Sequence, residues 1–325
     1  MSDSTYPPGL PPYIVVFGPS SNCTLDLCPL EYSVYRYRPS LPANITFIAL
    51  YILALLVHAY LGFCWKQIWF MVCMILGCLS EIVGYVGRVL MHGNPFMFAG
   101  FMIQIVFITS GPIFYTAAIY ITLSKAITHF SPSLSRIPPR LYYWIFIPAD
   151  VICLFLQAGG GALSTVSSGS NQTGIDLAFA GLILQVIVIF AFCFLFADHM
   201  LRFFRHSSSS SFSKGGYVGV SKAVALAPWR MNTFLGGLAA SILLILARCV
   251  FRCYELREGY SGETLSDEGL FIGLEGVLIV VAVFALCFGH PGLVFDRKDQ
   301  TVIKGPESEN HSGSSYRLID LRESH

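Results

Sequence analysis

The sequence IDLAFAGLILQVIVIFAFCFLFADH, residues 175–199, decides the fold class, because it has no charged residue between Asp176 and Asp198. An α-helix rises ~1.5 Å per residue, so about 20 apolar residues cross the ~30 Å hydrocarbon core of a bilayer. Several stretches of the chain meet this requirement, at about 44–64, 69–90, 97–123, 141–166, 175–199, 232–251 and 269–289. The sequence therefore predicts an all-α integral membrane protein, a bundle of seven transmembrane helices.

The composition supports lipid as the solvent of this chain. Of its 325 residues, 54% are hydrophobic and 12% are charged, whereas about a quarter of the residues are charged in an ordinary soluble domain. The formal net charge of +1 argues against nucleic acid as a partner, because phosphate binding needs an excess of basic residues. With no phosphate-binding GxxxxGK[ST] motif and His58 as the only deep histidine, we expect no cofactor, no metal site and no enzymatic activity.

The lysine and arginine residues predict the orientation. Most of them lie in segments that would be cytoplasmic if the amino terminus were outside, as the positive-inside rule requires. The glycosylation sequons at Asn22 and Asn171 would then both face outward. We expect an extracellular segment over 1–43, a membrane domain over 44–291 and a disordered cytoplasmic tail over 292–325.

Two of the ten cysteines differ from the others in their surroundings. Most of the cysteines lie in apolar runs, where a thiol behaves as a small hydrophobic side chain. Cys23 and Cys28, in contrast, bracket TLDL in the polar amino-terminal segment. A small disulfide loop and two free thiols both fit this position.

Polar residues inside the predicted spans point to a site. Glu81, Tyr85 and Arg88 lie at i, i+4 and i+7, on one face of the second helix. Charges at this depth are costly when unpaired, so we expect them to pair with Arg248 and Glu275 of the sixth and seventh helices. The full set of candidate site residues is Glu81, Tyr85, Arg88, Gln104, Asp150, Gln157, Gln185, Arg248, Arg252, Glu255, Glu268 and Glu275.

These residues have two interpretations. They form either a hydrated pocket that opens toward the outer leaflet, beneath an acidic loop with Glu255 and Glu268, or a set of contacts that only hold helices together. The first is favoured because Asp150 and the glutamines exceed what charge pairing needs. Asp150 has no obvious basic partner and is the candidate for proton exchange. Gly111 and Pro112 predict a kink in the third helix, with the freed carbonyl bonded to a neighbouring group.

Several motifs together resemble the fungal lipid-translocating exporter family, also called RTA-like proteins after resistance to aminocholesterol. The matching stretches are YRPSLPAN at 37–44, GCLSEIVGYVGR at 77–88, FIPADV at 146–151, ARCVFRCYELREGYSG at 247–262 and HPG at 290–292. They follow in order across nearly the whole membrane domain. The resemblance implies seven spans and export of sphingoid long-chain bases or sterol-like toxic amphiphiles, with resistance to such compounds.

The resemblance also implies membrane lipids and an amphiphilic small molecule as partners, and a position in the plasma membrane or an endomembrane such as the vacuole. A porphyrin transporter, as in one branch of the family, is an alternative. A seven-helix receptor of a lipid is another, although the chain has no Asp-Arg-Tyr after the third helix and no Asn-Pro-x-x-Tyr in the seventh. The oligomeric state does not follow from the sequence.

Overall fold

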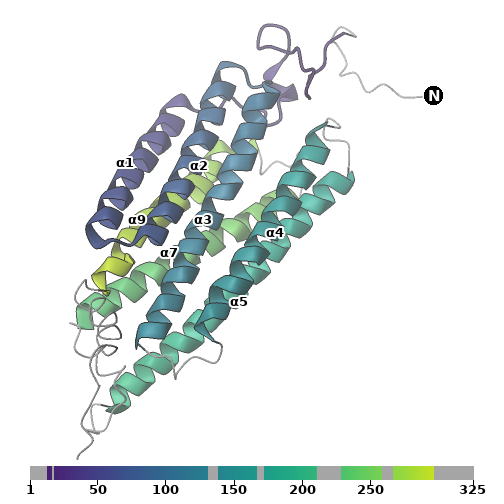
Figure 1. Ribbon diagram of the computed structural model, residues 1–325. Helices are drawn as coiled ribbons and strands as arrows, with labels where there is room; N and C mark the ends of the chain where they lie inside the picture. Colours follow the sequence, from purple (N-terminus) through teal and green to yellow (C-terminus); the bar gives the residue numbers. More distant parts are fainter. Residues whose placement is uncertain are drawn as a thin grey trace, which may run out of the picture. The chain divides into compact units, whose positions relative to one another are not determined.

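A computed structural model describes residues 13–16, 18–130, 138–166, 172–210, 228–257 and 266–295. All regular structure in these residues is helical (Figure 1). Seven helical segments among them are long and apolar enough to cross a membrane. The predicted class, a seven-helix membrane protein, is confirmed.

The spans follow one another along the chain. The first six are α1 (Leu41–Trp65), α2 (Ile68–Gly93), α3 (Phe98–Phe130), α4 (Pro139–Val166), α5 (Gln172–Ser210) and α7 (Pro228–Arg257). The seventh is continuous from α8 (Glu268–Leu270) through the π-helical segment η4 (Phe271–Val277) to α9 (Leu278–Phe288). Short 3₁₀ turns, η1 (Leu30–Tyr32) and η5 (Pro291–Leu293), lie before α1 and after α9.

Three helices are longer than the apolar stretches that predicted them. The stretches end at about 123, 199 and 251, whereas α3, α5 and α7 continue to residues 130, 210 and 257. Backbone hydrogen bonds are internal to an α-helix, so a helix can continue beyond the hydrocarbon core. Hydropathy therefore marks the part of each helix that lipid can surround, and not its end.

Consecutive helices from α1 to α5 pack side by side and alternate in direction (Figure 1). Helix α7 contacts α3, α5 and α9, whereas α1 contacts α2 and α9 and lies at the edge of the bundle. Small residues allow close packing: a Cβ atom on Gly160 would collide with the backbone of α5, and one on Gly237 with the backbone of Gly289.

Residues 13–40, apart from residue 17, form a cap segment over one end of the bundle, which we call the capped end (Figure 1). Helices α1 and α3 begin at this end, and α2 ends there. Arg38 Nε donates a 2.7 Å hydrogen bond to the carbonyl of His92, and Ser21 Oγ donates one of 3.3 Å to the carbonyl of Phe96. The cap segment is thereby fixed to the connection between α2 and α3.

Candidate functional site

A buried ion pair joins α7 to the seventh span. Arg248 donates a 2.8 Å hydrogen bond to Oε1 of Glu275, and both side chains are almost fully buried. Glu275 belongs to the π-helical segment η4. π-Helical turns are rare in proteins, and those that occur are often found at functional sites. The sequence led us to expect that Glu81 and Arg88 of the second helix pair with Arg248 and Glu275, whereas these last two residues pair with each other.

Arg252 extends this pair into a row of alternating charges. It lies one turn after Arg248 on α7 and bonds Glu275 at 3.3 Å and Glu255 at 2.5 Å. The expectation that Glu255 lies in an acidic loop was wrong. Helix α7 continues to residue 257, and its regular geometry places Glu255 three residues from Arg252, on the buried face.

Arg88 connects α2 to the same end of the bundle. Its guanidinium lies 3.7 Å from Glu268 and donates hydrogen bonds to Tyr37 at 3.0 Å and Asn44 at 3.2 Å. The ring of Phe271 lies 3.7 Å from the guanidinium carbon, a cation–π contact. The acidic partner of Arg88 is therefore Glu268 rather than a glutamate in the middle of the seventh span, because α2 ends where α8 begins.

The cap segment supplies polar groups to this cluster. Tyr35 accepts a 2.8 Å hydrogen bond from Gln104, and the backbone amide of Ser40 donates one of 2.5 Å to Glu268. Burial raises the pKa of Tyr35 and of Tyr37, an effect that the nearby arginine opposes. Both phenols therefore stay neutral at physiological pH, and they keep their hydroxyl groups as hydrogen-bonding partners.

Glu81 differs from the other charged residues of the cluster. It is buried, takes part in no ion pair within the described ranges, and its Oε1 atom has no hydrogen-bond partner. The hydroxyl groups of Tyr51 and Tyr85 are also buried without a partner. The ring of Tyr85 stacks on Phe47 at 4.9 Å and on Tyr51 at 5.7 Å between centroids. Sequence reasoning missed Tyr51, although its spacing of four from Phe47 puts both rings on one face of α1.

Asp150 and the glutamines of α4 and α5 form separate hydrogen-bond networks. Asp150 Oδ2 accepts from Thr116 at 2.9 Å and from Tyr120 at 3.1 Å, and its Oδ1 atom has no partner. Gln157 donates a 2.8 Å hydrogen bond to Gln185. The single pocket expected from the sequence is thus divided, because α4 packs mainly on α3 and α5. The i, i+4 spacing of Thr116 and Tyr120 was the available signal for this acceptor site.

The family model described as RTA1 like protein matches residues 74–298, more than half of the chain. The chain belongs to the RTA1-like family. All of the arginine and glutamate residues of the cluster lie inside the matched range, whereas the cap segment precedes that range. No solved structure matches this RTA1-like chain.

Three relatives from Saccharomyces cerevisiae cover most of the chain. The sphingoid long-chain base transporter RSB1 is 28% identical over 313 residues, 88% of this chain and 82% of the relative. Protein RTA1 is 29% identical over 250 residues, 76% and 74% of the two chains. Protein RTM1 is 30% identical over 217 residues, 66% and 65% of the two chains.

Of the predicted modification sites of this RTA1-like protein, Asn22, Cys23 and Cys28 lie on the cap segment. A disulfide joins Cys23 and Cys28, whose Cα atoms are 5.9 Å apart, and both residues pack on Phe96. Asn22 is exposed, and its side chain bonds the backbone of the cap segment. Asn171, the other predicted glycosylation site, lies outside the described residues, as does the predicted tail from residue 296 onward.

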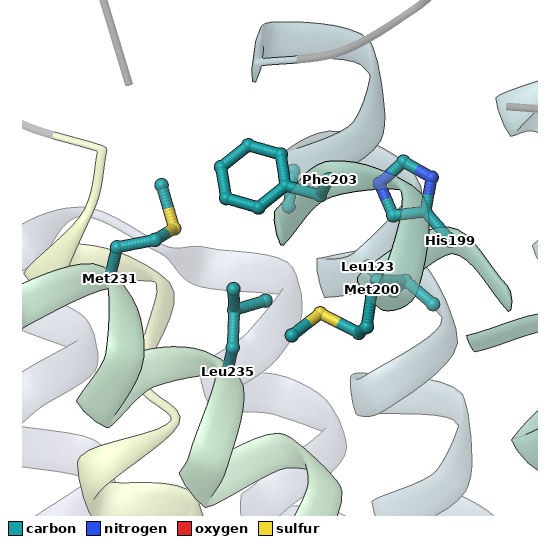
Figure 2. Close-up of a pocket in the computed structure, with 7 residues that line it drawn as sticks. Leu123, His199, Met200, Phe203, Met231 and Leu235 are labelled. Atoms are coloured by element: carbon teal, nitrogen blue, oxygen red, sulfur yellow. The ribbon is translucent and has the colours of Figure 1, made fainter. Parts of the chain in front are cut away.

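A pocket lies away from the capped end, near the later turns of α3 and α5 (Figure 2). Its lining is apolar except for one imidazole and consists of Leu123, Ala126, His199, Met200, Phe203, Met231 and Leu235. None of the residues predicted to form the polar site contributes to it. In the charged cluster at the capped end, the ion pairs are in direct contact.

Proposed function

We propose that this protein moves amphiphiles with a cationic head group, of the sphingoid long-chain base type, across the membrane without chemical change. The observation that carries the proposal is the similarity to a sphingoid long-chain base transporter over 88% of this chain. A similarity that extends over 313 residues is not confined to one motif.

The chemistry of the bundle supports the same substrate class. A lipid crosses a bilayer slowly because its polar head must leave water, and polar groups within the membrane usually mark the path of a polar or charged substrate. Among the residues that the structure describes, Glu81 of α2 and Asp150 of α4 are buried carboxylates that form no ion pair. Carboxylates stabilise a cation and repel an anion, which favours an amine over a phosphate as the head group.

We further propose that the capped end faces outward and that the protein acts in the plasma membrane. The distribution of lysine and arginine supports the first statement. The position of the Cys23–Cys28 disulfide on the cap segment agrees with an oxidising compartment on that side. The resemblance to lipid exporters supports the plasma membrane as the place of action.

Reconstitution tests the proposal. Purified protein is placed in liposomes that contain a fluorescent sphingoid base or a fluorescent phospholipid, with and without a pH gradient, and the movement of each lipid between leaflets is measured. An unrelated seven-helix protein at the same protein-to-lipid ratio controls for unspecific movement. We expect faster movement of the sphingoid base than in the control, and a smaller effect on the phospholipid.

Movement of both lipids at the control rate would contradict the proposal. Coupling to a G protein in response to the sphingoid base, without movement of that base, would instead establish a receptor.

A further inference from the structure

The charged cluster contains one carboxylate more than its arginines neutralise. Three ion pairs join Arg88 to Glu268, Arg248 to Glu275 and Arg252 to Glu255. Among the residues that the structure describes on these helices, Glu81 is a further buried carboxylate, and it lies within electrostatic range of Arg248 and Glu275 without contacting a base. A monovalent cation beside Glu81 would balance the cluster.

Two hydroxyl groups near Glu81 also lack partners. Tyr51 and Tyr85 each lie within electrostatic range of Glu81, are at most 1% exposed, and form no hydrogen bond through the hydroxyl group. Their stacked rings, with Phe47 beside Tyr85, fix the direction of both hydroxyls. The backbone of α3 closes the other side, since a Cβ atom on Gly111 would collide with the carboxylate of Glu81.

Contacts that only hold helices together would be expected to satisfy these atoms. A buried polar atom without a hydrogen bond destabilises the folded state, and most buried polar atoms in folded proteins are paired. Several buried polar groups of this bundle are paired in this way: Gln157 bonds Gln185, and Ser241 bonds the carbonyl of Ala282 on α9. Three unsatisfied groups gathered around Glu81, from α1 and α2, point to a bound molecule as their partner.

A protonated primary amine fits these groups. An ammonium group donates three hydrogen bonds and provides the positively charged partner that Glu81 lacks. A hydroxyl group on the neighbouring carbon of the amine can form a hydrogen bond with a tyrosine. The rings of Phe47, Tyr51 and Tyr85 offer an apolar wall to the first carbons of a chain. Tyr51 belongs to α1, which lies at the edge of the bundle (Figure 1).

We propose that Glu81, Tyr51 and Tyr85 form the head-group site for a long-chain primary amine, with Glu81 binding the ammonium group. This inference rests on the proposed function, because it assigns a site to the same substrate class. The inference gives Glu81 a different role from the paired glutamates, which hold the arginines in place.

Binding to purified protein in detergent tests the site. The probes are a tritiated C18 sphingoid base and its N-acetyl derivative, which keeps the hydroxyls and the chain but has no charge. We expect the wild-type protein to bind the base at least about tenfold more tightly than the derivative, since a charge-assisted hydrogen bond is the stronger kind. Glu81→Gln should lower the affinity for the base to about that of the derivative.

Tyrosine variants make the test independent of folding. Tyr51→Phe and Tyr85→Phe each remove a hydroxyl without a partner in the protein, so the melting temperature should be unchanged or higher while the affinity for the base falls by about fivefold. Tyr142→Phe, a buried tyrosine of α4, is the matched control and should bind the base as the wild type does.

The inference is overturned if all three site variants bind the base as tightly as the wild type, or if their affinity falls only together with the melting temperature. It is also overturned if Glu81→Gln changes the pH dependence of binding alone, because Glu81 would then exchange protons only. Movement of the base in liposomes by all three variants at the wild-type rate would leave the proposed function standing with its site elsewhere. Binding at Glu81 without movement of the base would leave the site standing and contradict transport.

Discussion

The guanidinium group of Arg248 donates a 2.9 Å hydrogen bond to the carbonyl oxygen of Ile108, four residues before Pro112 in α3. Proline has no backbone N–H, so this carbonyl cannot be bonded within its own helix. Arg248 provides the missing donor and binds Glu275 with the same nitrogen atom, Nη2. The neighbouring group expected from the proline is therefore a charged residue, and it links α3, α7 and the seventh span.

This arrangement predicts that Arg248 is structural. Arg248→Ala should lower the free energy of unfolding by about 3–5 kcal/mol, because it leaves Glu275 buried beside one base fewer and Ile108 without its donor. Thermal unfolding in detergent measures the loss. The double variant Arg248→Ala/Glu275→Ala should lose less than the sum of the two single variants, since the two residues interact directly. Additive losses would show that the pair contributes nothing to stability.

The fold could be predicted from the sequence because lipid imposes one simple condition. Each span must be about 20 residues long and apolar, and seven stretches satisfy this without any knowledge of packing. The continuation of α5 beyond residue 199 could not be predicted, because a helix in polar surroundings has no hydropathy signal. The fold of the cap segment could not be predicted either, since it depends on contacts with Phe96 and His92, which lie far along the chain.

The candidate site could be predicted from the sequence only in part. The spacing of Glu81 and Arg88 places both on the buried face of α2, as expected, but their surroundings differ. Seven residues of helix are enough to bring Arg88 to Glu268 at the capped end and to leave Glu81 beside Arg248 and Tyr51. Which helices pack against α2 at each level depends on tertiary contacts, and a single sequence does not contain them.

Glycosylation tests the orientation. If the capped end faces outward, endoglycosidase treatment should increase the gel mobility of the protein expressed in a eukaryotic cell, and Asn22→Gln combined with Asn171→Gln should abolish this shift. The exposed position of Asn22 leaves its side chain accessible to the transferase. The control is Asn310→Gln, which removes the sequon of the carboxyl-terminal segment. A shift that survives in the double variant and disappears in Asn310→Gln would reverse the orientation.

The disulfide should hold the cap segment in place. Cys23→Ser combined with Cys28→Ser should lower the stability of the segment by about 2 kcal/mol, since the loop that this disulfide closes is short. Limited proteolysis should then cut the segment before the membrane domain, while the wild type stays intact. Cys64→Ser, which changes an exposed free cysteine, is the control. Labelling of Cys23 or Cys28 by a thiol reagent in the unreduced wild type would contradict the expectation.

Asp150 should govern the response of transport to pH. Its carboxylate accepts hydrogen bonds from Thr116 and Tyr120 and, in the part of the chain that the structure describes, lies in no ion pair. Asp150→Asn keeps an oxygen that can accept both bonds but cannot take up or release a proton, so the melting temperature should be preserved while the dependence of transport on pH is lost. Transport of the sphingoid base into liposomes is measured between pH 5.5 and 8, beside Asp176→Asn, an exposed residue of α5 that should behave as the wild type. An unchanged pH profile in Asp150→Asn at wild-type stability would assign proton exchange to another carboxylate, and Glu275, with two arginines beside it, would be a poorer candidate than Glu81.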